Sequence, residues 1–175
     1  FMCNHWPSRY GGAVKSSPSR EAAAAVVRHI VDSLAVNEPA TKVVIMGDLN
    51  DDPRDKSISV VLGAAGNPTS LPAEGLFNPF FQIHKDGYGT LCYRGNWNLF
   101  DNIIVSNNLV NAKAGTLKIV PSKQGYYGYI FKKRFMMTPR GQYKGYPLRT
   151  WSGTNFLNGY SDHLPVYIHL KVEDK

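Results

Sequence analysis

Several short stretches of the sequence place polar groups beside apolar runs, where they could do chemistry. The first is Gly-Asp-Leu-Asn-Asp-Asp-Pro, residues 47–53, which directly follows the apolar run 43–46. Loops at strand ends hold functional groups on a rigid sheet, so Asp48 and Asn50 could face one site while Leu49 points into the fold. A carboxylate and an amide suit a hard cation such as Mg²⁺. The two aspartates that follow fit a capped turn better.

A second stretch is Ser-Asp-His-Leu-Pro, residues 161–165, directly before the apolar segment that ends the chain. Asp162 could be a metal ligand next to a base, because the turn before Pro165 can splay neighbouring side chains. Among ionisable side chains histidine has the unperturbed pKa nearest neutrality, so His163 suits proton transfer at working pH. A structural hydrogen bond between neighbours is the alternative.

Two further stretches carry polar groups into apolar surroundings. Asp101 lies inside the run 98–105, where a buried, isolated carboxylate is costly, so it must be paired or solvated. Asn-His-Trp-Pro-Ser-Arg, residues 4–9, comes at the end of a predicted strand. Its Arg9, like Arg149 later in the chain, could grip a substrate phosphate or form a surface salt bridge.

The elements that must position these groups are mainly strands. Apolar and alternating runs predict strands at 1–5, 43–46, 90–94, 100–106, 116–120 and 164–172. Gly95-Asn96 predicts a hairpin turn between the third and fourth of them. Residues 121–160, rich in Gly, Tyr and Lys, allow no firm prediction. Of the tryptophans, Trp151 could line a pocket, whereas Trp97 fits a buried core better.

One long amphipathic helix is predicted between the first two strands. Ser17 as N-cap and Pro18 in the first turn mark its start, and Asn37-Glu38-Pro39 mark its end. A short helix is predicted at 56–62. The long helix should bury one face, made of Ala23, Val26, Val27, Ile30, Val31 and Leu34. Strands and helices mixed in this way predict an α/β sandwich in a single domain, residues 1–175.

Composition sets limits on the protein class. The chain has 175 residues, 43% of them hydrophobic and 12% aromatic, which suits one compact domain with a core. No apolar run approaches the roughly 18 residues that cross a bilayer, and there is no signal-peptide pattern. We therefore expect no transmembrane segment and a soluble protein, with its compartment and export left open. Two cysteines make no disulfide framework.

The net charge of +7 comes from one segment. Residues 102–161 contain nine Lys and Arg and no acid, whereas the rest carries eleven against thirteen acids. Aromatic residues are interleaved with these charges, namely Tyr126, Tyr127, Tyr129, Phe131, Phe135, Tyr143, Tyr146 and Trp151. This mixture suits a phosphate-bearing partner that offers rings or lipid to pack against. On charge alone, a solvated basic surface over core aromatics is favoured.

Together, and in this order, the four stretches resemble the endonuclease/exonuclease/phosphatase superfamily. That group includes pancreatic deoxyribonuclease, abasic-site endonucleases, inositol-polyphosphate phosphatases and neutral sphingomyelinases. The resemblance runs through NHWPSR, VIMGDLNDDP, FDNIIVS and GYSDHLPV, and so spans nearly the whole chain. It implies a four-layer α/β sandwich of two packed mixed sheets flanked by helices. It also implies a phosphoesterase that uses Mg²⁺ or Mn²⁺, with a phosphodiester or phosphomonoester as substrate.

The resemblance implies roles for the matching residues. His5 would contact the scissile phosphate, with Asn4 beside it at the substrate. Asp48 and Asn50 would orient the attacking water and bind phosphate or a second cation. Asp162 would be the carboxylate ligand of the metal.

His163 resembles the adjacent family histidine, and Asp101 the strand carboxylate that holds it. That pairing would supply the partner that Asp101 needs. Whether Asp48 or His163 takes the proton from water stays open. So does the substrate, either nucleic acid or a lipid or sugar phosphate, which Arg9, Arg149 and Trp151 could help to bind.

The sequence departs from the family pattern in one respect. The family also uses an acidic metal ligand, usually Glu, and an Asn, both from strands before the position of residues 4–9. We expect an upstream segment of the same domain to supply the acidic ligand, which would make the chain N-terminally incomplete; loss of that half is the alternative. The competing function is a catalytically inactive phosphate- or nucleic-acid-binding module on the same fold.

Overall fold

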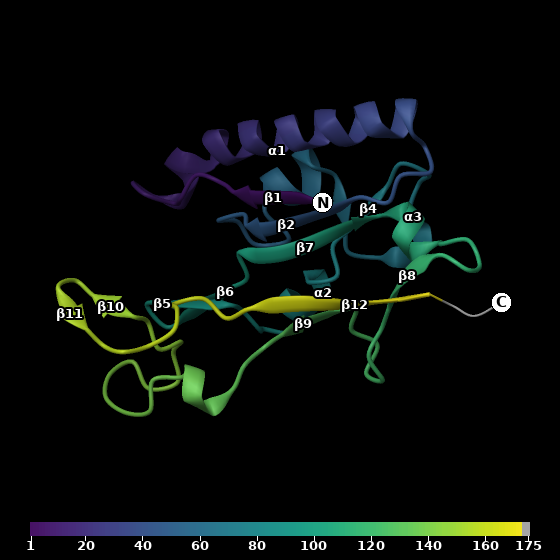
Figure 1. Ribbon diagram of the computed structural model, residues 1–175. Helices are drawn as coiled ribbons and strands as arrows, with labels where there is room; N and C mark the ends of the chain where they lie inside the picture. Colours follow the sequence, from purple (N-terminus) through teal and green to yellow (C-terminus); the bar gives the residue numbers. More distant parts are fainter. Residues whose placement is uncertain (173–175) are drawn as a thin grey trace.

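Two sheets and one long helix make up the body of the protein in a computed structural model that describes residues 1–172 (Figure 1). The larger sheet is mixed, with the order β1 (Met2–His5), β2 (Val44–Asp48), β7 (Asp101–Ser106), β4 (Leu76–Phe77) and β3 (Ala64–Ala65). The smaller sheet is antiparallel, with the order β8 (Leu117–Val120), β12 (Val166–Val172) and β9 (Gly128–Ile130). Two hairpins, β5 (Leu91–Tyr93) with β6 (Asn96–Asn98) and β10 (Trp151–Ser152) with β11 (Asn155–Phe156), stand apart.

The helices differ greatly in length. The long helix α1 (Ala13–Asn37) lies across the outer face of the larger sheet. The short helices are α2 (Phe81–Lys85) and α3 (Asn107–Val110), and the predicted short helix at 56–62 is a π-helical turn, Ser57–Val61. Single 3₁₀ turns occur at Pro68–Ser70 and Arg134–Met136. None of the helices in residues 1–172 has both the length and the apolar character that a membrane crossing needs.

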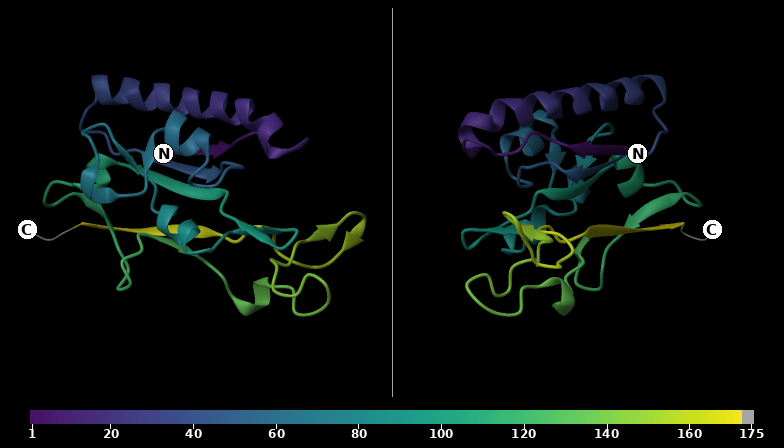
Figure 2. Two further views of the ribbon diagram at one scale, coloured as in Figure 1. Left: turned by 180° about the vertical axis from the view of Figure 1, so that it is seen from behind. Right: turned by 60° about the vertical axis from the view of Figure 1, so that its left-hand side comes forward.

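The elements stack as three layers, seen from three sides in Figures 1 and 2. Apolar side chains of α1 and the larger sheet form one core, which includes Val27, Ile45 and Leu49. Two further clusters, around Val105 and Phe80, fill the space between the sheets. The expected fourth layer, a helix over the smaller sheet, is not found among residues 1–172, and only the larger sheet is mixed as expected.

The outer face of the smaller sheet explains why it can remain uncovered by a helix. Along β12 the inward residues are aliphatic, whereas Tyr167 and His169 point outward. Tyr129 of β9 stacks on Tyr167 with ring centroids 4.8 Å apart, and the His169 ring packs edge-on at 4.9 Å. Antiparallel sheets commonly bury one face and leave a polar-tipped face to water.

The sequence located six of the twelve strands in residues 1–172, missed the short strands β3, β4, β6, β9, β10 and β11, and located the long helix less well. Each of the six predicted strands is present, with ends shifted by at most two residues. The helix start at Ser17 is wrong, because α1 begins at Ala13 and Pro18 lies inside it. Pro18 lacks the N–H that would bond to the Val14 carbonyl, but Val14 is exposed and water can satisfy that carbonyl.

The predicted buried face of α1 was also partly wrong. Val26 and Ile30 are exposed, and the face is centred on Arg20, Ala24 and Val27. Because the charged Arg20 is part of the buried face, that face is rotated around the helix from the one that apolar spacing predicts. The hairpin at residue 95 is real, but its turn is Arg94-Gly95, both with positive φ, and its second strand is β6.

Arg20 is buried because carboxylates and carbonyls surround it. It is 1% exposed, its Nε lies 2.7 Å from Asp51 Oδ1, and its Nη2 donates to the Ala13 carbonyl. Arg9 belongs to the same network: its Nη2 lies 3.1 Å from the same Asp51 Oδ1 and 2.5 Å from Asp55 Oδ2. These ion pairs tie the loop after β2 to α1 and to the loop after β1.

Gly47 lets β1 and β2 lie next to each other. Its φ is +137°, and a Cβ there would lie 1.8 Å from the Asn4 carbonyl oxygen. No side chain fits, because the obstacle is backbone and cannot move aside. Gly47 therefore fixes how Asn4 and His5 lie beside the end of β2.

We expect Gly47→Ala to lower the free energy of unfolding by about 2–5 kcal/mol, from the clash together with backbone strain. Gly63→Ala is the matched control, since Gly63 also has positive φ but has nothing within 4 Å of its Cβ position. It should cost only about 1–2 kcal/mol. Urea denaturation measures both, and equal losses would show that the close approach at Gly47 is unimportant.

Candidate active site

Strand register brings three of the expected residues into one row across the larger sheet. His5 of β1 is paired with Asp48 of β2, and Asp48 is paired with Asp101 of β7. His5 Nε2 lies 3.6 Å from Asp48 Oδ2. Asp48 was expected in a loop, but it is the last residue of β2, and Asp101 is the first residue of β7. The row therefore lies at one end of the sheet.

The segment before β12 contributes His163 to this row. Its Nδ1 lies 2.7 Å from Asp101 Oδ2, so Asp101 has the partner that it was expected to need. The chain before β12 is held there by hairpin β5–β6, where the Thr90 carbonyl accepts from Leu164 N at 2.8 Å. The Ser161 hydroxyl accepts from His163 N and fixes the turn from the other side.

Negative charge dominates the cluster. Ligand atoms of Asp48, Asp101 and His163 all lie within 4.8 Å of one another, and all three side chains are half-buried. Like charges directly opposite each other on neighbouring strands destabilise a sheet. Burial lowers the pKa of His163, but the hydrogen bond to Asp101 and the nearby carboxylates outweigh it and raise that pKa above its ordinary value. The imidazole therefore tends to hold a proton.

Asp162 lies beside this cluster and outside it. Its carboxylate Oδ2 is 3.2 Å from Arg149 Nη2, and both side chains are about half exposed. Its charge is nevertheless among those that raise the pKa of His163. Arg149 reaches this position from the chain just before hairpin β10–β11.

The two expected asparagines support the site through the backbone. Asn50 adopts a positive φ of 52°, its N–H donates to Asp48 Oδ1 at 2.9 Å, and its Nδ2 donates to the Trp6 carbonyl. Leu49 between them is fully buried, as predicted. Asn4 donates along its own strand and accepts from the Trp6 ring nitrogen at 3.2 Å. Both side-chain amides are thus hydrogen-bonded to Trp6.

Arg9 and Trp151 lie differently from each other. The Arg9 guanidinium contacts three carboxylates and lies 4.3 Å over the Phe100 ring, which matches the salt-bridge alternative. Trp151 is 56% exposed on β10, with its ring 5.0 Å from that of Phe156. Trp97, predicted in the core, is only half-buried and is covered by Lys132.

The basic segment contains an exposed surface that extends from the end of β9 to hairpin β10–β11, at the end of the molecule where β2 ends (Figure 1). We call it the basic–aromatic surface; it consists of Phe131, Lys132, Lys133, Arg134, Phe135, Arg140, Tyr143, Lys144, Trp151, Phe156 and Tyr160, all exposed. Other aromatics of the segment are core, since Tyr127 packs edge-on against Phe77. The aromatics of the segment therefore divide between the core and the exposed surface.

Asp48, Asp101 and His163 lie close enough together to hold a metal ion, and carboxylate oxygens are ligands that Mg²⁺ and Mn²⁺ prefer. Of the other expected ligands, Asn50 carries an amide oxygen and Asp162 lies outside this group. The pair of His163 and Asp101 is satisfied internally, with a proton held between them. It is therefore better suited to proton transfer than to holding the cation, although its atoms lie near enough to be ligands.

Sequence reasoning missed the buried ion network behind the site. Asp51 accepts from Ser57 Oγ at 2.6 Å and from Arg9, and it also forms an ion pair with Arg20. Asp52 Oδ1 accepts from Leu99 N at 2.6 Å. Arg20, on the apolar stripe of α1, was the signal that could have revealed it. A charged residue at a buried helix position requires an opposite charge nearby.

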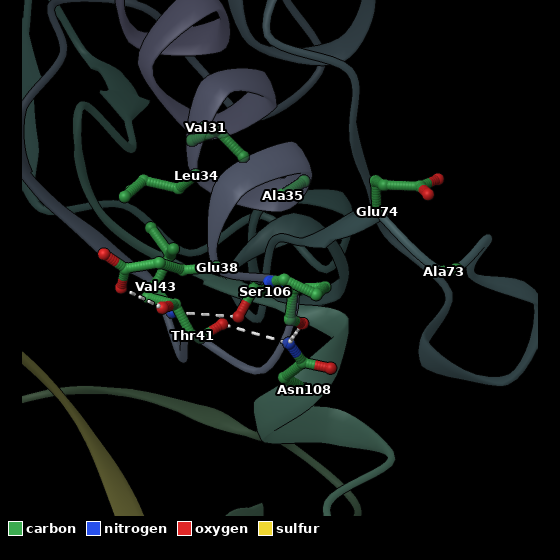
Figure 3. A pocket seen from close by; sticks show the side chains of 11 residues that line it. Val31, Leu34, Ala35, Glu38, Thr41, Val43, Ala73, Glu74, Ser106 and Asn108 are labelled. Atoms are coloured by element: carbon green, nitrogen blue, oxygen red, sulfur yellow. Dashed lines mark hydrogen bonds between the residues drawn. The ribbon is translucent and has the colours of Figure 1, made fainter.

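One hollow lies away from the row of acids. It measures about 130 Å³ and lies between the end of α1 and the start of β2, as Figure 3 shows for Val31, Leu34 and Val43. At its rim, the Glu38 carboxylate accepts a hydrogen bond from the Thr41 hydroxyl. The row lies at the other end of β2, so this hollow takes no part in the site.

A family model described as "Endonuclease/Exonuclease/phosphatase family" matches residues 1–172. The match covers the four stretches and both sheets. Searches among curated proteins and among solved structures gave no match. The family match thus agrees with the motifs and with the row of acids and imidazoles.

We expect Asp101→Asn to lower the pKa of His163, because the variant loses the charge that offsets burial. Because the pKa of His163 is raised in the folded state, its ion pair with Asp101 adds to the free energy of unfolding at pH below the ordinary histidine pKa. This contribution is lost as pH rises through the raised pKa. That loss should be smaller in the variant. NMR titration of the His163 ring with a chelator present, with urea denaturation across the same pH range, measures both.

Asp32→Asn is the matched control, since Asp32 is an exposed carboxylate paired with Arg28 on α1. It should leave the His163 titration unchanged. An unchanged titration in Asp101→Asn as well would remove Asp101 as the residue that holds the imidazole proton.

Proposed function

The chain belongs to the endonuclease/exonuclease/phosphatase family, and we propose that it hydrolyses a phosphate ester by in-line attack of an activated water, assisted by Mg²⁺ or Mn²⁺. The observation that carries the proposal is the row of His5, Asp48 and Asp101 with His163 at its end. Two opposed carboxylates cost stability, and a role at a cation and a phosphate explains why the chain contains them.

The protonation states suggest a division of labour between Asp48 and His163. His163 has a raised pKa and a hydrogen bond from Nδ1 to Asp101, so its Nε2 is the atom available to donate towards the phosphate. Asp48 is a carboxylate at the row's centre and is the better acceptor for the water proton. His5, at the open end of the row, adds a further donor, and one well-placed donor is worth roughly 10²–10³ in turnover.

A divalent cation would be held by oxygens of Asp48, Asn50 and Asp162. When bound, it would neutralise charge on the phosphate and lower the pKa of a coordinated water. We propose that a segment outside residues 1–172 adds a strand to β1 and supplies one more acidic ligand. The free edge of β1 in the larger sheet supports this, since unpaired edges are usually covered.

The basic–aromatic surface favours nucleic acid as the substrate over a lipid or sugar phosphate. Its exposed Lys and Arg residues would follow a phosphate backbone, and its exposed rings would stack on bases. In the described residues it lies at the same end of the molecule as the row of acids. A single strand offers both partners at once.

We expect His163→Ala and Asp48→Ala each to lower turnover by at least about 10²-fold, because each removes a proton-transfer group. His29→Ala, on the exposed side of α1, is the control and should keep full activity. The assay uses the full-length protein with Mg²⁺ or Mn²⁺ and plasmid DNA, RNA, an inositol phosphate, sphingomyelin and a generic diester. Phosphate binding without hydrolysis of any of these would favour the inactive binding module instead.

Binding of single-stranded DNA should weaken steeply with salt, since each neutralised phosphate releases counterions. Removing Lys132 and Lys133 together should reduce the log–log salt slope by about 1.4, at roughly 0.7 per contact. A double variant at Lys85 and Lys171, exposed residues outside the basic–aromatic surface, should leave the slope unchanged. Fluorescence anisotropy measures the slopes, and a flat salt response of the unmodified protein would exclude this substrate.

A further inference from the structure

Arg149 and Asp162 form an ion pair at the edge of the proposed site. Arg149 Nη2 lies 3.2 Å from Asp162 Oδ2, and the side chains are 46% and 50% exposed. Asp162 directly precedes His163, which we place at the reacting phosphate. The guanidinium is therefore close both to a proposed cation ligand and to the proposed position of the substrate.

The backbone around Arg149 is held firmly. The Leu148 carbonyl accepts from Tyr160 N at 2.9 Å, and Thr150 Oγ1 donates to the carbonyls of Gly159 and Tyr160. A Cβ at Gly159 would lie 2.0 Å from the Leu148 oxygen, so only glycine permits this approach. These contacts between residues 148–150 and 159–160 hold the Arg149 backbone near Asp162. The long Arg149 side chain remains half exposed and able to turn.

A guanidinium and a divalent cation compete for the same carboxylate. Exposed ion pairs are weak, with a contribution that corresponds to only about 1.5- to 5-fold in an equilibrium constant. A divalent cation held by several oxygens is the stronger partner of Asp162. Cation binding therefore displaces Arg149 and leaves its five N–H donors without this acceptor.

A phosphate is the natural next partner of the displaced side chain. The planar guanidinium matches two phosphate oxygens at once, which a lysine ammonium cannot do. The substrate phosphate would lie between the cation and His163, within the region that Arg149 already borders. The phosphate would also lie near the carboxylates Asp48 and Asp101, whose negative charge the cation would screen.

Building on the proposed function, we propose that Arg149 exchanges partners, from the Asp162 carboxylate to the substrate phosphate, when a divalent cation takes that carboxylate. Arg149 then links cation loading to substrate binding. A cation strengthens phosphate binding beyond its own direct attraction, because it also frees the guanidinium. The same exchange makes Arg149 a weak competitor of the cation.

The first test measures Mn²⁺ affinity by calorimetry on the full-length protein. Arg149→Ala should tighten Mn²⁺ binding by about 1.5- to 5-fold, because the competitor is gone. Lys171→Ala removes an equal charge from the exposed side of β12, outside the basic–aromatic surface, and should change the affinity less. In an Asp162→Asn background, Arg149→Ala should no longer tighten binding, which would assign the effect to this pair.

The second test measures binding of inorganic phosphate at saturating Mn²⁺. Arg149→Ala should weaken phosphate binding by about 10-fold or more, as expected for a hydrogen bond to a charged group. Arg149→Lys should restore only part of the loss, since it keeps the charge without the planar fork. Lys171→Ala should again have little effect.

The outcomes separate this inference from the proposed function. Unchanged Mn²⁺ affinity in Arg149→Ala, or unchanged phosphate affinity, overturns the exchange while the cation site and the hydrolysis stand. Absence of any Mn²⁺ binding overturns both. Tightened Mn²⁺ binding together with weakened phosphate binding supports the exchange even in a protein that hydrolyses none of the tested esters. Circular dichroism confirms that each variant is folded.

Discussion

The direct opposition of two carboxylates, Asp48 and Asp101, governs the structure around the site. Their strands pair residue by residue, so the register of the sheet places them face to face. A slip of one residue would send one of them to the other face of the sheet. Two imidazoles flank these acids, with His5 beside Asp48 on one side and, on the other, His163, whose pKa the hydrogen bond to Asp101 raises despite burial. A sheet built for stability alone would place neither acid there.

The residues after Asp48 support this arrangement from behind. Asp51 and Asp52 do not join the row; they bind the buried Arg20, the half-buried Arg9, a serine hydroxyl and a backbone N–H. This fixes the loop through Asn50, whose N–H in turn holds the Asp48 carboxylate. A cluster of acids in sequence thus divides into one group that faces the site and others that hold its backbone.

The sequence predicted six of the strands, because apolar runs are local signals, whereas the Asp101–His163 pairing was implied by the resemblance to the family. It failed where distant residues decide the outcome. Pro18 suggested a helix start, yet burial of Arg20 against Asp51 keeps the turn before it helical. Arg9 had two equal interpretations, and only the fold shows three carboxylates around it. The row itself depends on strand register, which no local pattern encodes.

The site also depends on how the two sheets pack. Asp101 belongs to the larger sheet and His163 lies three residues before β12 of the smaller one, so their 2.7 Å contact depends on how the sheets are docked. Ile103 of β7 and Ile168 of β12 pack in the shared core around Phe80. Each side chain of the pair therefore sits at the rim of an apolar contact between layers. Loosening that contact would separate the His163 imidazole from the Asp101 carboxylate before either sheet unfolds. The pair is therefore coupled more tightly to core packing than to the stability of either sheet.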